Sequence, residues 1–263
     1  FNERVVLEKN LRHALDRGEF IIHYQPQISV RDGQICGFEA LIRWNSPELG
    51  FVSPLSFIKI AEDSRLIVPI GEWVLREACA FAKRLEDDGF GTYKIAVNIS
   101  VVQLLEEDFV GKVLQILQET GLNPEYLELE ITESMIMETL ESLVPKLNEL
   151  KANGIQIALD DFGTGYSSLG SLKQMPITTL KVDRSFIEHL PEQDDSRSLA
   201  KAIVLIGRKM GLQVIAEGVE TKQQMEHVRR AKCDVIQGYY ISKPLPEVEL
   251  RDLLRSFPLD EMA

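Results

Sequence analysis

The chain has 263 residues, of which 44% are hydrophobic, and its formal net charge is −12. That length suits one α/β barrel, which typically takes about 250 residues, so we expect a single domain over residues 1–263. The excess of acidic side chains argues against a nucleic-acid polymer or an anionic membrane surface as the main partner, because both attract Lys and Arg.

The cysteines Cys36, Cys79 and Cys233 are odd in number, far apart and in apolar surroundings, which indicates reduced core residues. No apolar run approaches the roughly 20 residues of a membrane span and no secretory leader is present, so we expect a cytoplasmic domain. Because the chain begins at Phe1 and not at methionine, we interpret it as a piece of a longer protein, which other domains could tether to a membrane.

The first 19 residues carry Leu7, Leu11, Ala14 and Leu15 at helical spacing. We therefore expect a helix in this segment. It could continue a connector from an upstream sensory or regulatory domain.

Apolar runs typical of strands alternate with amphipathic helical stretches along the rest of the chain. Eight strands are expected, at residues 20–29, 35–44, 94–99, 126–132, 155–160, 178–182, 213–217 and 234–238. Alternation of strands and helices favours a parallel sheet, and eight strands favour its closure into a barrel.

The first two expected strands break this alternation, because only a short turn around Asp32 and Gly33 joins them. Such a short link cannot connect parallel neighbours. The second strand carries Glu39 and Arg43, whose side chains are candidates for the chemistry of the site. We therefore expect the first strand to be the reversed one. The prediction is a TIM-like (β/α)8 barrel whose first strand is antiparallel to the rest.

Five oxygen-bearing side chains close separate expected strands: Glu39, Asn98, Glu130, Asp160 and Glu217. A single acid at a strand end is typical of a cap or a surface group. Five in one domain predict a shared cavity at the carboxyl ends of the barrel strands. Alternation along the strands turns Asn98, Glu130, Asp160 and Lys181 inward and leaves Asp161 at the rim.

Such a cavity needs positive charge. Two carboxylates about 4 Å apart repel by roughly 4 kcal/mol at an effective dielectric constant of about 20. Carboxylate and amide oxygens without clustered His or Cys indicate Mg²⁺ or Mn²⁺ and not zinc. The adjacent Asp160 and Asp161 suit a bridged pair of ions, one inside and one nearer the rim.

The order of eight segments makes the chain resemble the EAL domain, the cyclic di-GMP phosphodiesterase family, from about residue 7 to about residue 250. The segments are YQPQI, EALIRW, AVNIS, ELEITES, ALDDFGTGYSSL, LKVDRSFI, IAEGVET and IQGYYISKPL. The signature itself is Glu39-Ala40-Leu41.

The resemblance implies hydrolysis of one phosphodiester bond of cyclic di-GMP to linear 5′-pGpG, which ends a bacterial second-messenger signal. It also implies a homodimer and two ions, Mg²⁺ or Mn²⁺, with Ca²⁺ binding but not supporting turnover. The residues that match the family's metal ligands are Glu39, Asn98, Glu130, Asp160, Asp161 and Glu217. Lys181 matches the lysine that orients or deprotonates the attacking water, and we group it with Glu39 and Glu217 as catalytic.

Four further residues are expected at the substrate. Arg43 would grip a phosphate oxygen, and Gln25 and Gln237 would supply amide contacts to the nucleotide. The two glutamines could instead serve only the hydrogen-bonding needs of the barrel end. Asp183 would either partner Lys181 or contact the substrate.

A rim loop is expected at residues 161–169, where two glycines fall within three residues. Glu133 matches the carboxylate that anchors this loop in the family, and it would let Asp161 reach the second metal. Glu220, three residues after Glu217, is a second expected anchor.

Two other functions remain open at this stage. One is a catalytically silent module that binds cyclic di-GMP or a partner protein, although this chain keeps the family pattern at every position named above. The other, which ignores the resemblance, is a barrel metalloenzyme that acts on an enolisable acid with Lys181 as the base; it leaves the EALIRW segment unexplained. Trp44 is expected to pack in the core or to border the site.

Overall fold

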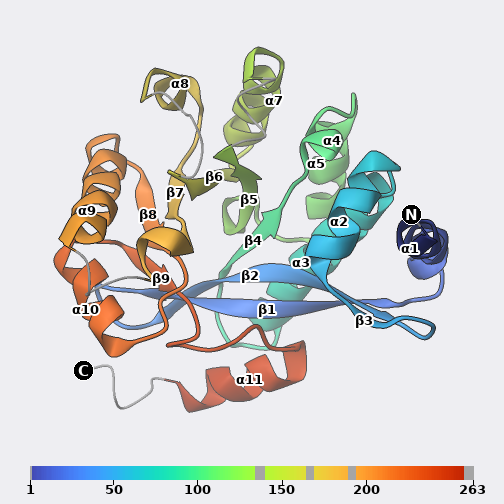
Figure 1. The fold of residues 1–263 in the computed structure, drawn as a ribbon, viewed down its shortest axis with the longest axis horizontal. Coiled ribbons are helices and arrows are strands. Elements are labelled where there is room, and N and C mark those ends of the chain that lie inside the picture. Colours follow the sequence, from blue (N-terminus) through green and yellow to red (C-terminus); the bar gives the residue numbers. More distant parts are fainter. Residues whose placement is uncertain (1, 134–139, 164–168, 189–193, 258–263) are drawn as a thin grey trace.

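The computed structural model describes residues 2–133, 140–163, 169–188 and 194–257. Its centre is a closed barrel of strands with helices packed around the outside (Figure 1). No helix in these ranges combines the length and the apolar character needed to cross a membrane.

In the described ranges eight strands form the barrel, in the spatial order β1-β9-β8-β7-β6-β5-β4-β2, and a β1–β2 pairing closes it. The strands are β1 (Phe20–Ser29), β2 (Ile35–Ser46), β4 (Lys94–Asn98), β5 (Leu127–Thr132), β6 (Gln156–Phe162), β7 (Thr179–Val182), β8 (Gln213–Ala216) and β9 (Val235–Gln237). β1 is antiparallel to both of its neighbours, whereas the other barrel pairs are parallel. The predicted barrel with a reversed first strand is confirmed.

One strand was not predicted. β3 (Gly50–Val52) pairs with the end of β2 as an antiparallel hairpin outside the barrel. Three residues are too few to show an alternating pattern, so the sequence offers no periodic signal for this strand.

The helices cover the outside of the barrel (Figure 1). They are α1 (Asn2–Ala14), α2 (Pro54–Asp63), α3 (Ile67–Asp87), α4 (Val101–Leu104), α5 (Phe109–Thr120), α7 (Leu140–Ala152), α8 (Leu169–Gln174), α9 (Asp194–Lys209), α10 (Lys222–Arg230) and α11 (Glu247–Ser256), with short 3-10 turns η1 (Pro124–Tyr126) and η2 (Arg184–Phe186). The expected N-terminal helix is present as α1, which packs beside α2.

Local sequence explains several helix ends. α10 begins with a capping box, in which the Thr221 side chain accepts from the Gln224 backbone and Gln224 accepts in return from Thr221. α5 ends at Gly121, whose φ of 74° is the left-handed conformation that glycine adopts without a steric penalty.

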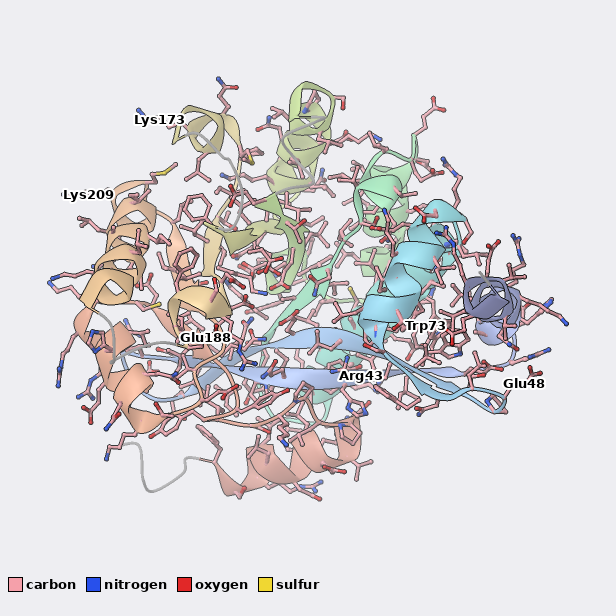
Figure 2. All side chains as sticks on the ribbon, in the orientation of Figure 1. Arg43, Glu48, Trp73, Lys173, Glu188 and Lys209 are labelled. Atoms are coloured by element: carbon pink, nitrogen blue, oxygen red, sulfur yellow. The ribbon has the colours of Figure 1, made fainter. Side chains whose placement is uncertain are left out.

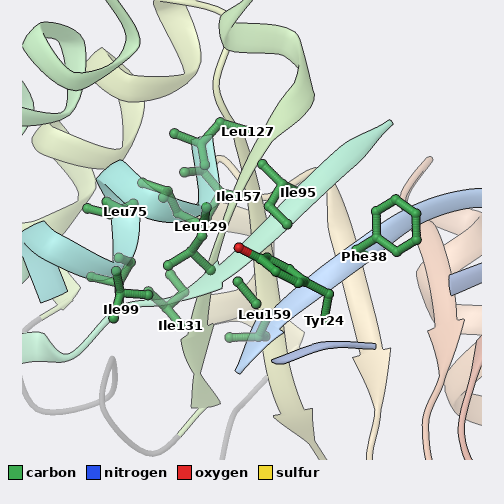
Figure 3. Close-up of a cluster of buried hydrophobic side chains, with 14 of the residues drawn as sticks. Tyr24, Phe38, Leu75, Ile95, Ile99, Leu127, Leu129, Ile131, Ile157 and Leu159 are labelled. Atoms are coloured by element: carbon green, nitrogen blue, oxygen red, sulfur yellow. The ribbon is translucent and has the colours of Figure 1, made fainter. Parts of the chain in front are cut away.

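Charged side chains on the outer helices, such as Lys173 on α8 and Lys209 on α9, project away from the barrel, whereas Arg43 on β2 lies nearer the middle (Figure 2). Between strands and helices lies a layer of aliphatic side chains (Figure 3). Ile95, Leu127 and Leu129 in this layer are at most 1% exposed. They are the residues that strand alternation turns toward the helices.

The amino-terminal end of the barrel interior is filled by a polar cluster. Lys94 Nζ donates to Gln156 Oε1 at 2.8 Å and to Gln213 Oε1 at 2.9 Å, and Thr179 donates to the buried Glu128. Because these groups satisfy one another at one end, the chemistry is left to the opposite end, where the parallel strands finish.

Trp44 is a packing residue. Its side chain is fully buried beside Phe20 and Phe57, and its Nε1 donates to Glu19 Oε2 at 2.8 Å. Of the two positions expected for Trp44, the structure shows the core and not the border of the site.

We therefore expect Trp44→Phe to lower the free energy of unfolding by about 2 kcal/mol, because it leaves a space and removes a partner of the buried Glu19 carboxylate. Urea unfolding measures the change. Trp73→Phe is the matched control, since Trp73 also packs on Phe20 but is only half-buried. Equal losses in the two variants would contradict the role given to the Trp44–Glu19 bond.

Candidate active site

Lys181 is the centre of the carboxyl-terminal end of the barrel. It lies on β7, and its side chain is 0% exposed. Its Nζ atom is 2.8 Å from Glu130 Oε1, 2.8 Å from Glu217 Oε1, 3.4 Å from Asp160 Oδ2 and 3.7 Å from Glu39 Oε2. Residues on or directly after β2, β5, β6 and β8 thus converge on one ammonium group, as strand alternation predicts.

The charge of this cluster is unbalanced. Burial opposes the ammonium form of Lys181, but the carboxylates around it outweigh burial and hold its pKa well above the ordinary value. Burial and the charge of Glu39 raise the pKa of Glu130 well above its usual range. Burial likewise raises the pKa of Glu217, and the attraction of Lys181 offsets only part of that rise. One cation is therefore too little for the carboxylates that share it.

Glu39 is the carboxylate of the cluster that accepts hydrogen bonds from neighbouring amide side chains. Burial raises the pKa of Glu39. The charge of Lys181 and the hydrogen bonds from Gln237 and Asn98 together lower it by more, so the net shift is downward. Asn98 Nδ2 donates to Glu39 Oε1 at 2.7 Å. That bond orients the amide of Asn98, and its Oδ1 oxygen accepts no hydrogen bond within the described ranges.

Glu130 is the least-supported carboxylate. It is 1% exposed, and within the described part of the chain neither oxygen accepts a hydrogen bond of good geometry. The Lys181 ammonium is near enough for an ion pair, but it is not aligned as a donor. Buried carboxylate oxygens without donors are costly unless a cation satisfies them. This arrangement fits a metal ligand.

Asp160 and Asp161 occupy a β-bulge. Leu159 pairs with Leu180 and Phe162 pairs with Val182, so β6 contains one more residue than β7 between these pairs. The extra residue gives Asp161 a φ of 55°, a left-handed conformation that aspartate tolerates better than most residues.

The bulge changes where Asp161 points. One oxygen from each of Asp160, Asp161 and Glu217 lies within 4.8 Å of the other two. Burial and the neighbouring Asp160 raise the pKa of Asp161. Strict alternation would send Asp161 to the opposite face, so the bulge decides that two consecutive aspartates share one site.

The donor set of this cluster fits a hard divalent cation. Its groups are carboxylates and one amide oxygen, and no His or Cys accompanies them within the described ranges. Oxygen ligands of this kind suit Mg²⁺, Mn²⁺ or Ca²⁺.

Gln25 and Gln237 lie in a buried amide network. Gln237 Nε2 donates to Glu39 Oε2 and, at 3.1 Å, to Gln25 Oε1, while its Oε1 accepts from Gln27 Nε2 at 3.0 Å. Gln25 Nε2 in turn donates to Ser242 O at 3.3 Å. The network positions Glu39, and the contacts of the two glutamines with a nucleotide stay a prediction.

Sequence reasoning missed Gln27. Its signal was available, because Gln27 lies two residues after Gln25 on β1 and therefore on the same face.

Arg43 borders an apolar cavity of about 440 Å³ between β2, α2 and α3. The lining includes Ile58 and Val74. The cavity also reaches Asn98 and Glu130, which belong to the cluster of oxygen ligands around Lys181. Arg43 Nη1 donates to Ile42 O at 2.9 Å, and no carboxylate of the described ranges pairs with its guanidinium. Arg43 therefore keeps donors for an anion next to the cluster.

The remaining predicted residues surround the rim. Asp183 Oδ1 accepts from the Ser185 backbone at 3.0 Å and so caps η2. The buried Glu133 accepts from Gly163 N at 2.8 Å, a contact suited to the expected loop anchor, although residues 164–168 of that loop lie outside the described ranges. Glu220 Oε1 lies 3.1 Å from Arg184 Nη2.

Fold and site together define a (β/α)8 barrel with an acidic, metal-type centre, and comparison with known proteins gives the family. The family model described as EAL domain matches residues 8–244. A protein named bifunctional diguanylate cyclase/cyclic di-GMP phosphodiesterase MucR, from Pseudomonas aeruginosa, is 42% identical over 248 residues, which are 94% of this chain and 36% of that protein. Cyclic di-GMP phosphodiesterase PdeR of Escherichia coli is 41% identical over 253 residues, 94% of this chain and 38% of that protein.

A solved structure described as "PaMucR Phosphodiesterase, c-di-GMP complex" has a TM-score of 0.89 and 42% identity to the chain, and the match covers 93% of this chain and 99% of the other. The chain belongs to the EAL domain family. It spans about a third of the length of the curated relatives named above.

We predict that Mn²⁺ raises the melting temperature of the wild-type domain and that Glu130→Gln removes this response. In metal-free buffer the same variant should be more stable than wild type by about 1 kcal/mol, because it removes one of several crowded charges. Differential scanning calorimetry with and without EDTA measures both effects.

The control is Glu128→Gln, which changes a buried glutamate on the same strand and the same face. Glu128 is bonded to Thr179 in the polar cluster at the other end of the barrel, so this variant should lose stability and keep the full Mn²⁺ response. A full response in Glu130→Gln would contradict its assignment as a ligand.

Proposed function

We propose that the chain is a metal-dependent phosphodiesterase domain that hydrolyses one bond of cyclic di-GMP and gives linear 5′-pGpG. The observation that carries this proposal is the cluster of carboxylates around the buried Lys181, beside which Arg43 pairs with no carboxylate of the described ranges. The names of two relatives at 41% and 42% identity, both cyclic di-GMP phosphodiesterases, support the substrate.

The proposed metal ligands for two ions, Mg²⁺ or Mn²⁺, are Glu39, Asn98, Glu130, Asp160, Asp161 and Glu217. Bound ions would supply Lewis-acid chemistry, since they lower the pKa of water and polarise a phosphate. The rest of the work falls to the chain itself: Gln237 and Asn98 hold Glu39 in place, and the bulge holds Asp160 beside Asp161.

Lys181 lies among the proposed metal ligands. Without bound ions, the carboxylates around it outweigh burial and raise its pKa. The family resemblance gives this lysine the orientation or the deprotonation of the attacking water, and the proposal keeps both roles. A buried ammonium also stabilises negative charge that develops on a phosphate.

Arg43 and the apolar cavity would bind the nucleotide. The guanidinium can donate to a phosphate oxygen in a bidentate manner. The cavity of about 440 Å³ opens beside it, and its aliphatic lining, including Ile58 and Val74, suits the flat face of a purine base.

The partners of the domain belong to the same proposal. The chain covers 31% of the oxygen sensor protein DosP of Escherichia coli, at 38% identity. We propose that residues 1–263 are one domain of a longer, signal-regulated protein, that α1 continues into an upstream sensory or regulatory domain, and that the domain works as a homodimer.

The deciding experiment incubates the domain with cyclic di-GMP in Mg²⁺, Mn²⁺ or Ca²⁺ and follows 5′-pGpG by chromatography. We expect product with Mg²⁺ and Mn²⁺, and binding without turnover in Ca²⁺. Binding of the nucleotide without product in Mg²⁺ or Mn²⁺ would instead identify a silent receptor.

Lys181→Gln tests the ammonium role. At saturating Mn²⁺ we expect kcat to fall by about 10² or more, because positioned proton donors contribute on that scale. Lys94→Gln is the control, since Lys94 lies in the polar cluster at the other end of the barrel, and it should change kcat by less than about threefold. Wild-type kcat in a folded Lys181→Gln domain would remove Lys181 from the chemistry.

A further inference from the structure

The short turn η2 lies between the two loops that carry the rim ligands. It directly follows β7, the strand of Lys181, and β7 lies between β6 and β8 in the barrel. Asp161 stands near the end of β6, and Glu217 directly follows β8. One turn of three residues is thus adjacent to both sides of the cluster formed by Asp160, Asp161 and Glu217.

On the β6 side, Phe186 packs against Gly163. A Cβ atom on Gly163 would lie 2.7 Å from the Phe186 ring, so only glycine leaves room for this contact. Gly163 also has a φ of 100°, and its N–H donates to Glu133 at 2.8 Å. The backbone two residues after Asp161 is therefore held between an aromatic ring and a buried carboxylate.

On the β8 side, Arg184 packs against Gly218. A Cβ atom on Gly218 would lie 2.4 Å from Arg184 Cγ, so the apolar stem of the arginine covers the backbone next to Glu217. The guanidinium continues to Glu220, with Nη2 3.1 Å from Oε1. Contacts at Gly218 and at Glu220 thus fix the loop after β8 on both sides of Val219.

Hydrogen bonds close the turn itself. Asp183 Oδ1 accepts from Ser185 N at 3.0 Å, and Phe186 N donates to Asp183 O at 3.1 Å. Ile187, which follows the turn, is 1% exposed. Asp183, expected from the sequence to touch Lys181 or the substrate, has a structural task in this turn.

We propose that η2 is a strut, in which Phe186 and Arg184 are positioning residues that hold Asp161 and Glu217 at the spacing one divalent cation requires. The inference rests on the proposed metal-dependent function. It explains how Asp161 keeps its left-handed conformation, because a strained backbone persists where its surroundings over-determine it. Phe186 contacts Gly163, and Arg184 contacts Gly218 and Glu220, so both residues act through the two loops.

The test measures Mn²⁺ binding by calorimetry in the wild-type domain, in Phe186→Leu and in Arg184→Ala, without substrate. We expect the affinity to fall about tenfold in each variant, as is typical when a group that orients a ligand is lost. Arg184→Lys should recover part of the loss, because it keeps the stem over Gly218. In turnover assays the Mn²⁺ concentration for half-maximal rate should rise, while kcat at saturating Mn²⁺ stays near the wild-type value.

Arg84→Ala is the matched control. Arg84 is also a partly exposed arginine, 44% against 54% for Arg184, and it pairs with Glu247 on α11, away from the cluster. It should leave Mn²⁺ affinity unchanged. Metal-free melting temperatures of all variants separate loss of the strut from loss of the fold.

The outcomes distinguish this inference from the function on which it rests. Wild-type domain that binds no Mn²⁺ would overturn the metal-dependent function and the strut together. Tight binding by wild type and equally tight binding by Phe186→Leu and Arg184→Ala would overturn the strut alone. The strut would also be overturned if Arg84→Ala lost Mn²⁺ affinity as Phe186→Leu and Arg184→Ala do, and if the loss in every variant followed its fall in metal-free melting temperature.

Discussion

The burial of one ammonium group among several carboxylates is the constraint on which the rest of this structure depends. Lys181 has no exposed surface, and four carboxylates lie within 4 Å of its Nζ atom. A single positive charge cannot balance them in a low-dielectric interior, which the raised pKa values of Glu130 and Glu217 express. The excess negative charge around Lys181 therefore favours the binding of further cations, and the proposed chemistry depends on such cations.

The barrel holds this unbalanced cluster by dividing its support between strands. The reversed β1 brings Gln25 and Gln27 into register with β2 and β9, so that Gln237 can donate to Glu39. At the far end of the interior, Lys94 and its polar neighbours satisfy one another. Glu39 thus has amide donors, whereas no donor of good geometry among the described residues reaches Glu130. Hydrogen bonds therefore hold Glu39 in place, and the Glu130 carboxylate is left for a cation.

The rim of the site is shaped by backbone geometry and not by side chains alone. The bulge in β6 brings Asp161 to the side of Asp160, at the cost of a left-handed conformation. Glycines at 163 and 218 allow Phe186 and Arg184 to approach the backbone on both sides of η2. A site for a divalent ion needs oxygen atoms at fixed spacing. In our proposal, contacts made by Phe186 and Arg184, which are not ligands themselves, keep the ligands at that spacing.

The sequence by itself determined the eight barrel strands, the reversed first strand and the inward set Asn98, Glu130, Asp160 and Lys181, because alternation and a short turn are local signals. The ordered segments also pointed to the EAL domain family. The sequence also predicted that Asp160 and Asp161 share a metal site, but only the tertiary structure showed the bulge that brings them together. It alone showed that Gln237 supports Glu39 and that Asp183 caps a turn. A bulge depends on the register between two strands, and an amide network depends on strands 210 residues apart, so neither leaves a periodic trace in the sequence.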